Sequence, residues 1–218
     1  MVIPEFLLRV LVSPRLWLVI WLGIGAAGLL YVILSAALSG KPQEAGRHGG
    51  AAAILSDPRL QVGEMADFVY AASERTAPAE TFLHEGRQVS LAEFRGKTVL
   101  VNFWATWCAP CLKELPSLDA LEQELGGEDF AVVAIAADPK GPQAAQEFLD
   151  RLNLKNLKLY ADPTLSFTIA TGGSAVLPLS ILYDAHGREI GRYTGEADWS
   201  SAEAKALMRA SIASTSPQ

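Results

Sequence analysis

The segment N-F-W-A-T-W-C-A-P-C, residues 102–111, decides the fold of this chain. It holds both cysteines of the 218-residue sequence and joins an apolar run, residues 97–103, to residues 109–125, where leucines recur at helical spacing. The apolar run is rich in β-branched residues, which is typical of a central strand covered on both faces. We therefore expect the two cysteines at a strand-to-helix junction.

A zinc site, a structural disulfide and a pair of inert thiols each fit the two cysteines poorly. A structural zinc site needs four ligands, usually two such pairs, and the sequence has no second pair. A purely structural disulfide across so short a loop constrains the unfolded chain by only about 2 kcal/mol, against about 3 kcal/mol for a fifteen-residue loop. Two inert buried thiols are the remaining alternative, but such residues rarely cluster at a helix start.

A redox-active pair explains the placement better. Cys108 is expected just before the helix, where unpaired backbone N–H groups and the helix dipole favour a thiolate. The pKa of the Cys108 thiol should therefore fall below about 8.5. Its thiolate would attack a partner disulfide, and the more shielded Cys111 would resolve the mixed disulfide. Pro110 suits the first helical turn, and the small Ala109 should leave the Cys108 sulfur exposed.

The rest of the domain alternates predicted strands with predicted helices. Strands are predicted at residues 80–83, 88–90, 97–103, 130–137, 157–160, 179–183 and 189–193, and helices at 109–125, 143–152, 163–171 and 200–212. The last two strands flank a turn and should pair antiparallel. This order predicts an α/β fold with a mixed central sheet flanked by helices.

An uncharged apolar stretch, residues 16–38, lies near the N-terminus. As a helix it would extend about 34 Å, enough to cross a hydrocarbon core of about 30 Å, so we predict one transmembrane anchor there. A cleaved signal peptide, with Ala37 and Ser39 at the cleavage site, is the alternative. The predicted organisation is an N-terminal segment over residues 1–15, the anchor over 16–38, a Gly- and Ala-rich tether over 39–60, and one domain over 61–218.

Composition excludes several classes of protein. Half of the residues are hydrophobic, which is too many for a disordered chain. The formal net charge of −6 argues against nucleic-acid binding, which depends on neutralising phosphates. A chain of this length has room for one domain of ordinary size plus a small additional segment.

The cysteine motif resembles the membrane-anchored thioredoxin-like family that includes TlpA and ResA. The resemblance covers roughly residues 60–214 and also rests on K-E-L-P at 113–116, while G-E-A-D-W at 195–199 is similar to the TlpA branch. It implies a thioredoxin-like fold and thiol:disulfide oxidoreductase activity in the periplasm. The N-terminus would be cytoplasmic, with a single pass through the bacterial inner membrane. It implies no metal and no cofactor beyond a redox-active disulfide between Cys108 and Cys111.

The resemblance also assigns roles to individual residues. Trp107 would pack beside the nucleophile, and Trp104 would lie under the site. Pro178 would be a cis proline facing the two sulfurs, where it and Leu177 offer a backbone edge to the partner peptide. The expected substrate-binding residues are Trp107, Ala109, Pro110, Leu177 and Pro178.

Glu114 is the third expected catalytic residue. It lies three residues after Cys111 and resembles the proton-handling glutamate of the ResA-like proteins, where a buried carboxyl could act as general base. From the residues alone, a surface glutamate on the helix is the alternative. Thioredoxin has a buried aspartate six residues before its nucleophile, whereas this chain has Asn102, which cannot titrate.

Reduction of partner disulfides is the expected direction. Ala109 and Pro110 provide no donor that would stabilise the thiolate of a strong oxidant. The expected partners are a copper chaperone or the copper subunit of cytochrome oxidase, with electrons from a membrane thiol donor. Reduction of the haem-attachment cysteines of apocytochrome c is one alternative. Another is a non-enzymatic Cu(I) chaperone, with Cys108 and Cys111 as thiolate ligands.

Overall fold

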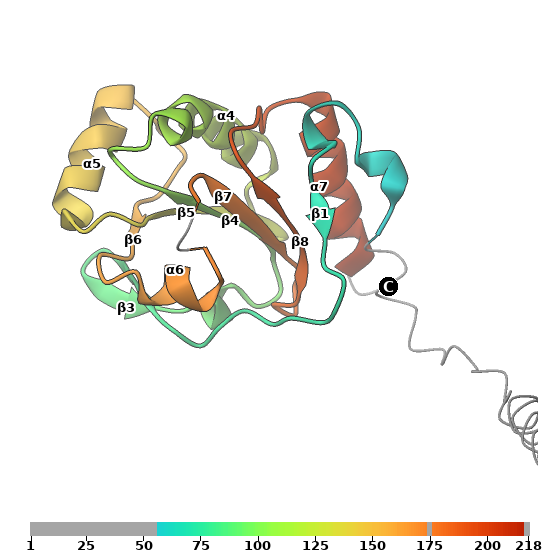
Figure 1. Cartoon of the computed structure of the whole chain (residues 1–218), viewed down its shortest axis with the longest axis horizontal. Coiled ribbons are helices and arrows are strands. Elements are labelled where there is room, and N and C mark those ends of the chain that lie inside the picture. Colours follow the sequence, from blue (N-terminus) through green and yellow to red (C-terminus); the bar gives the residue numbers. More distant parts are fainter. Residues whose placement is uncertain (1–55, 174–175, 216–218) are drawn as a thin grey trace, which may run out of the picture. The chain divides into compact units, whose positions relative to one another are not determined.

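The computed structural model describes residues 56–173 and 176–215, which form a domain around one eight-stranded sheet. The strand order is β1-β8-β7-β4-β5-β6-β2-β3 (Figure 1). The strands are β1 (Val69–Tyr70), β2 (Phe82–His84), β3 (Arg87–Val89), β4 (Thr98–Trp104), β5 (Phe130–Ala136), β6 (Tyr160–Ala161), β7 (Leu179–Tyr183) and β8 (Glu189–Thr194). Because β4 pairs parallel with β5 and antiparallel with β7, the sheet is mixed, as predicted.

Strand β4 is the centre of the sheet, and all of its residues are buried. Side chains alternate between the two faces of a strand. Leu100 and Trp104 accordingly belong to one core cluster, while Val101 and Phe103 belong to the other. This confirms the prediction of a central strand covered on both faces.

Helices cover both faces of the sheet. They are α4 (Ala109–Leu125), α5 (Gly141–Leu152), α6 (Ser166–Ala170) and α7 (Ala202–Thr215), with short 3-10 helices η1 (Pro58–Leu60), η2 (Gly63–Met65) and η3 (Leu91–Phe94). Figure 1 shows α4 and α7 on one face and α6 on the other. Of the five leucines at helical spacing on α4, Leu115, Leu118 and Leu121 are fully buried, whereas Leu112 and Leu125 are partly buried against the same core. The bounds of α4 are those predicted from the sequence.

Two predicted elements begin three residues later than expected, for identifiable reasons. Strand β6 begins only at Tyr160, because the Asp119 carboxylate accepts hydrogen bonds from the backbone N–H groups of Asn156 (2.8 Å) and Leu157 (2.9 Å). Helix α6 begins at Ser166, because Leu165 before it has a left-handed backbone with φ of 60°. The sequence reasoning also missed β1, whose two residues show no pattern and pair only with β8.

The folded part of the chain includes residues before 61. The Tyr70 hydroxyl donates a hydrogen bond to the Asp57 carbonyl at 3.0 Å, and Leu60 packs against the core cluster under α4. These contacts fasten η1 to the domain.

The predicted N-terminal segment and the predicted anchor at residues 16–38 lie outside the described residues, as does the tether up to residue 55. The chain divides into two units, residues 1–49 and 50–218, and the described residues all belong to the second. Within residues 56–173 and 176–215, none of the helices has the length and apolar character needed to cross a membrane.

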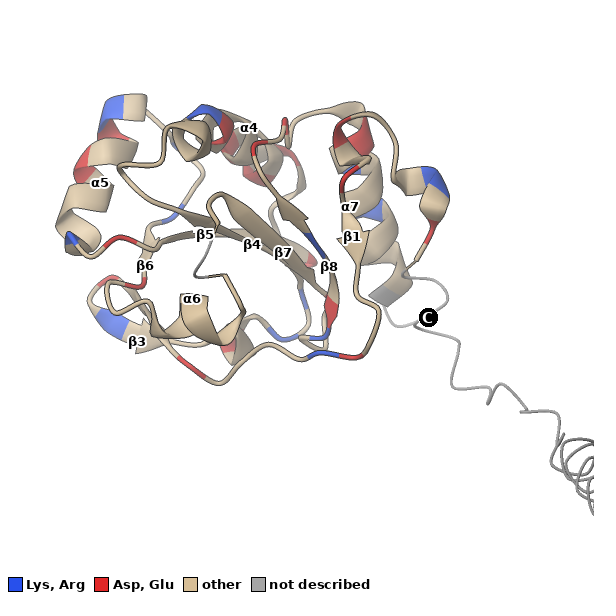
Figure 2. Ribbon diagram, in the orientation of Figure 1, with Lys and Arg blue, Asp and Glu red and all other residues tan. Residues whose placement is uncertain are grey.

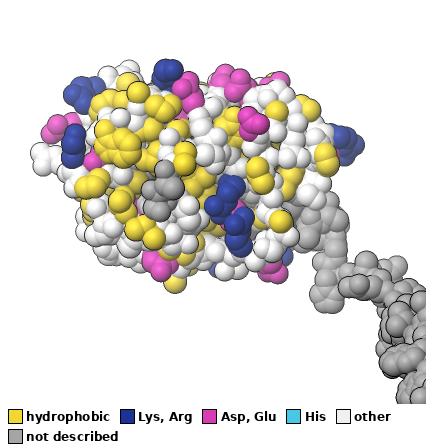
Figure 3. Space-filling model, viewed as in Figure 1, with side chains coloured by type: hydrophobic (Ala, Val, Ile, Leu, Met, Phe, Trp, Pro, Cys, Tyr) yellow, Lys and Arg dark blue, Asp and Glu magenta, His cyan; other side chains and the backbone are white. Residues whose placement is uncertain are grey.

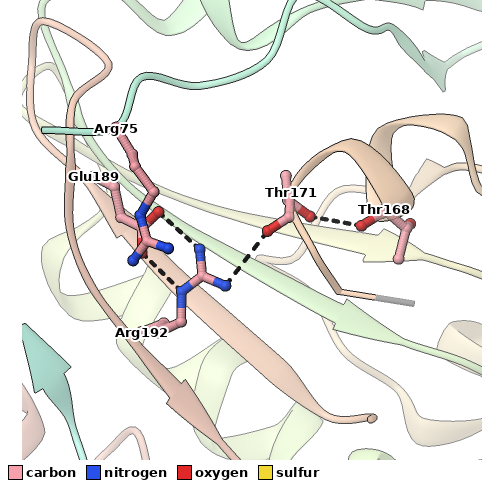
Figure 4. Close-up of polar contacts among 5 residues, drawn as sticks. All are labelled: Arg75, Thr168, Thr171, Glu189 and Arg192. Carbon is pink, nitrogen blue, oxygen red and sulfur yellow. Dashed lines mark hydrogen bonds and ion pairs between the residues drawn. The ribbon is translucent and has the colours of Figure 1, made fainter. Parts of the chain in front are cut away.

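A buried carboxylate joins β8 to two neighbouring segments (Figure 4). The Glu189 side chain is 3% exposed. It accepts hydrogen bonds from Arg192 (Nε–Oε1 and Nη2–Oε2, both 2.8 Å) and from Arg75 (Nη2–Oε1, 3.0 Å). Arg192 also donates to the Thr171 carbonyl at 3.4 Å. The cluster therefore ties the sheet to the end of α6, from which the chain runs on to β7.

We expect Arg192→Met to lower the free energy of unfolding by about 2 kcal/mol, because hydrogen bonds to a charged group contribute about 1.5–3 kcal/mol. Urea denaturation measures the loss. Arg59→Met is the matched control, since its ion pair with Asp57 lies on the surface and the Arg59 side chain is 89% exposed. That change should stay within about 0.5 kcal/mol. If both variants lose the same amount of unfolding free energy, the hydrogen bonds between Arg192 and Glu189 do not stabilise the fold as described.

Candidate active site

The two cysteines lie at the junction between β4 and α4, as predicted. Cys108 is the N-cap residue of α4 and is joined to Cys111 by a disulfide with an S–S distance of 1.99 Å. The Cys108 sulfur also accepts a hydrogen bond from the Cys111 backbone N–H, at 3.3 Å. Backbone N–H groups at a helix start stabilise negative charge. A thiolate at Cys108 is therefore the ionised form that this position favours.

The two sulfurs differ in exposure, but less than expected. Cys111 is fully buried and Cys108 is 5% exposed, whereas Ala109 and Pro110 are exposed. The expectation that Ala109 leaves the Cys108 sulfur exposed is wrong for the disulfide form, because that sulfur is bonded to the buried Cys111. Trp107, directly before the pair, is 63% exposed. Cys108 is still the sulfur on the solvent side.

Asp138, which the sequence reasoning missed, holds the loop before Cys108. Its Oδ2 accepts hydrogen bonds from the Thr106 hydroxyl (2.5 Å) and backbone N–H (3.0 Å), and its Oδ1 accepts from the Lys140 N–H (2.9 Å). Burial acts to raise the pKa of Asp138, but these hydrogen bonds outweigh it and hold the pKa below its ordinary value. Its position just after the carboxyl end of a buried parallel strand is the sequence feature that could have indicated it.

The other side of the site is the segment that leads into β7. The Leu177–Pro178 peptide bond is cis, the conformation that the resemblance implies. Leu179, the first residue of β7, pairs with Phe103 near the end of β4. Pro178 therefore lies at the end of the sheet at which β4 stops and the loop to Cys108 starts.

An apolar surface surrounds this edge of the sheet. Trp107 and Val176 are exposed, Val176 to 54%, and Leu177 is partly buried between the two core clusters. Figure 3 shows hydrophobic side chains gathered on this face, over the part of the sheet from which α4 and β7 start. The expected substrate-binding residues therefore lie in the two segments that meet at this end of the sheet, the loop and helix start after β4 and the residues before β7.

Glu114 is buried under α4 and is only 2% exposed, so the alternative of a surface glutamate is wrong. Its Oε1 accepts a hydrogen bond from Asn102 Nδ2 at 2.7 Å. Its Oε2 accepts from Trp199 Nε1 at 3.1 Å and from the Ala197 N–H at 3.2 Å. All of these contacts are donors, which suits a carboxylate. Because residues three apart lie on one face of a helix, Glu114 and Cys111 share the inner face of α4.

The Glu114 carboxyl is a weaker acid than an ordinary glutamate side chain. Burial raises the pKa of its carboxyl to about 7, although the hydrogen bonds from Asn102, Trp199 and Ala197 act in the opposite direction. The nearby charge of Glu196 makes a smaller contribution to this raised pKa. A carboxyl that titrates near neutral pH can both accept and return a proton, as a general acid–base group must.

A cleft of about 510 Å³ is lined in part by Glu114. Glu64, Glu196 and Asp198 line it together with Lys113, whose Nζ lies 3.4 Å from a Glu196 oxygen. Figure 2 shows the acidic residues along α4 and around the connection from β8 to α7. The cleft therefore brings solvent against the turn of α4 that carries Glu114.

No metal-binding cluster accompanies the site in the part of the chain that the structure describes. Among those residues, no group of three or more His, Cys, Asp or Glu side chains is placed to hold a metal ion.

Comparison with known families gives one match over most of the domain. The family model described as Redoxin matches residues 72–208, which is more than half of the chain.

Individual relatives match over shorter stretches. The thiol-disulfide oxidoreductase ResA of Bacillus thuringiensis is 35% identical over 112 residues, which cover 51% of this chain and 63% of that protein. The thioredoxin-like protein YneN of Bacillus subtilis is 39% identical over 71 residues, 32% of this chain and 41% of that protein. The matched region therefore spans less than two thirds of the length of these relatives.

Solved structures share the fold. A thiol:disulfide interchange protein of the thioredoxin family from Chlorobium tepidum superposes with a TM-score of 0.54 at 25% identity, covering 65% of this chain and 99% of that one. A secreted thiol-disulfide isomerase from Corynebacterium glutamicum gives a TM-score of 0.55 at 23% identity, covering 68% and 92%. The described domain has a thioredoxin-like α/β fold.

The raised pKa of Glu114 predicts that the free energy of unfolding falls as the pH rises from 4.5 to about 7. Its ordinary pKa is 4.5, so over this range the folded chain keeps a proton that the unfolded chain has lost. The fall attributable to Glu114 should be about 3 kcal/mol. Urea denaturation of the oxidised protein across this range, compared with Glu114→Gln, measures it.

Glu124→Gln is the control for that measurement, because Glu124 lies on the surface in ion pairs with Lys205 and Arg209. It should retain the fall that Glu114→Gln abolishes. If the free energies of unfolding of the wild type and Glu114→Gln differ by the same amount at every pH in this range, the pKa of Glu114 is not raised.

Proposed function

Since this chain belongs to the Redoxin family, we propose that it is a thiol:disulfide oxidoreductase that reduces disulfides in partner proteins. The observation that carries the proposal is the Cys108–Cys111 disulfide at the start of α4. One sulfur is at the helix N-cap, and the other belongs to a buried residue on the same face of α4 as the buried Glu114. A pair in two such different environments can perform two different chemical steps.

In the first step, the reduced protein uses Cys108. Its thiolate, stabilised by the N–H groups at the start of α4, attacks one sulfur of a partner disulfide. The partner S–S bond breaks, a first partner thiolate leaves, and a mixed disulfide joins Cys108 to the other partner sulfur.

In the second step, Cys111 resolves the mixed disulfide. The Cys111 thiol gives its proton to the Glu114 carboxylate, and the resulting thiolate attacks the Cys108 sulfur. The bond from Cys108 to the partner breaks, and the second partner thiolate leaves. Two electrons have then passed to the partner, Glu114 returns its proton through the cleft, and the chain has the disulfide seen in the structure.

The partner peptide would bind at the edge of the sheet where β7 begins. Leu177 and Pro178 present backbone next to the Cys108 loop, so an extended peptide can add there as a short strand. Trp107 and Val176, both exposed, would contact its apolar side chains, while Ala109 and Pro110 allow close approach to the sulfur.

A redox pair of this kind belongs in a compartment where disulfides form. We therefore place the domain in the periplasm, held to the bacterial inner membrane by residues 16–38, with the N-terminus in the cytoplasm. In that setting the proposed partners are a copper chaperone or the copper subunit of cytochrome oxidase. Apocytochrome c is the alternative partner, and a membrane thiol carrier would supply the electrons.

The test is trapping of the partner. Cys111→Ser in the full chain, expressed in its own cells, should accumulate a mixed disulfide through Cys108 that disappears on treatment with dithiothreitol. Non-reducing electrophoresis and mass spectrometry identify the trapped protein. An oxidase copper protein supports the first partner class and apocytochrome c the second.

Cys108→Ser is the matched control for trapping, because it keeps one cysteine but removes the nucleophile. It should accumulate no adduct, and the purified variant should not accelerate the reduction of insulin by dithiothreitol, whereas the wild-type chain should. Equal adducts in the two variants, or a wild-type chain that leaves insulin reduction at its uncatalysed rate, would refute the proposed activity.

A further inference from the structure

Asn102 is a polar residue in the middle of the central strand. It is fully buried and pairs across the sheet with Ser180 of β7, which is 3% exposed. Its neighbours on the same face of β4, Leu100 and Trp104, are apolar core residues. Fully buried polar side chains are uncommon and need hydrogen-bond partners.

The amide of Asn102 uses only one of its two ends. Its Nδ2 donates to Glu114 Oε1 at 2.7 Å and to the Ser180 hydroxyl oxygen at 2.9 Å. Its Oδ1 is buried and has no hydrogen-bond partner among the described residues. An unpaired buried acceptor destabilises the folded state. An apolar side chain would avoid that cost, so packing alone does not account for an amide at this position.

The partners of Asn102 determine which way its amide points. Rotating the amide by half a turn would bring Oδ1 against the Glu114 carboxylate, and two acceptors repel each other. The Ser180 hydroxyl accepts the second hydrogen of Nδ2 at 2.9 Å and so holds the amide in place beside Glu114. A donor held against a carboxylate stabilises its charged form.

We propose that Asn102, held by Ser180, is a positioning residue that keeps the Glu114 carboxylate available as the proton acceptor for Cys111. The inference rests on the proposed thiol:disulfide exchange and adds two residues to it. In the part of the chain that the structure describes, Asn102 is the only hydrogen-bond partner of Glu114 Oε1. This hydrogen bond therefore links β4, and through Ser180 also β7, to the carboxyl that takes part in the resolving step.

Other groups also act on the Glu114 carboxyl. The titratable or charged groups that face it or line its cleft are Glu64, Cys111, Lys113, Tyr193, Glu196 and Asp198. Trp199 Nε1 and the Ala197 N–H bind the other oxygen, Oε2. None of these groups changes in the variants that test Asn102, so a change in the titration of Glu114 reports the Asn102 contact.

The two steps can be followed separately by mixing the reduced full chain, in detergent, with 5,5′-dithiobis(2-nitrobenzoate). Attack by Cys108 releases the first coloured thiolate, and resolution by Cys111 releases the second. In Asn102→Leu, the midpoint of the pH profile of the second release should rise by about 1 pH unit, and its rate at pH 7 should fall about fivefold. The first release should keep its wild-type pH profile.

Three further variants make the test specific. Ser180→Ala should raise the same midpoint by a smaller amount, because Asn102 keeps its donor but loses its support. Asn102→Asp should also raise it, because a second carboxyl would lie beside Glu114. Ser214→Ala is the matched control: the Ser214 hydroxyl on α7 donates to the Ser211 backbone carbonyl at 2.8 Å, and among the described residues no hydrogen bond joins it to Glu114, Ala197 or Trp199. Its midpoint should equal that of the wild type.

Titration of the ¹³C-labelled Glu114 carboxyl by NMR gives an independent readout in the oxidised protein. Midpoints that are the same in wild type, Asn102→Leu and Ser180→Ala would overturn the positioning role. If Asn102→Leu does not fold, Ser180→Ala and Asn102→Asp decide the question. A wild-type chain that releases no coloured thiolate would refute the proposed function instead, and the NMR titration would still test Asn102.

Discussion

The burial of both faces of β4 is the constraint on which the rest of the structure depends. A strand covered on both sides must run straight through the core, so the chain leaves it only at its end, after Trp104. The next residues turn into α4, which brings Cys108 to the N-cap. Asp138, at the end of the adjacent parallel strand, holds the turn in place. The position of the sulfur therefore follows from the position of the strand.

The same burial gives the two sulfurs different surroundings. Cys108 is next to exposed residues and the N–H groups of a helix start, which favour a thiolate. Cys111, one turn further, is in the core on the same face of α4 as Glu114, a carboxyl that burial keeps from ionising easily. The polar groups under α4 form a connected set, in which Glu114, Asn102 and Ser180 are linked by direct hydrogen bonds. Residues that do not contact the sulfurs, such as Asn102 and Ser180, can therefore influence the acidity of Glu114.

Local patterns predicted the parts of this site that are continuous in sequence. The continuous apolar run of residues 97–103, the leucine spacing in 109–125 and the cysteine pair between them were enough to place the two cysteines at a strand-to-helix junction. The burial of Glu114 was not predictable in the same way, because a glutamate at that helical position is equally compatible with a surface. Only the resemblance to a family favoured the core. Asp138 and the role of Asn102 were missed because their partners are distant in sequence.

By itself, then, the sequence determined the α/β class, the bounds of α4, the mixed sheet and the location of both cysteines, because hydrophobic periodicity and helix-start chemistry act over a few neighbouring residues. Only the tertiary structure decided that Glu114 is buried, that its oxygens accept hydrogen bonds from Asn102 and Trp199, and that Pro178 lies next to the carboxyl end of β4. Those features depend on contacts between strands and helices that are 12 to 85 residues apart along the chain. Burial and its effect on acidity arise only when those segments pack together.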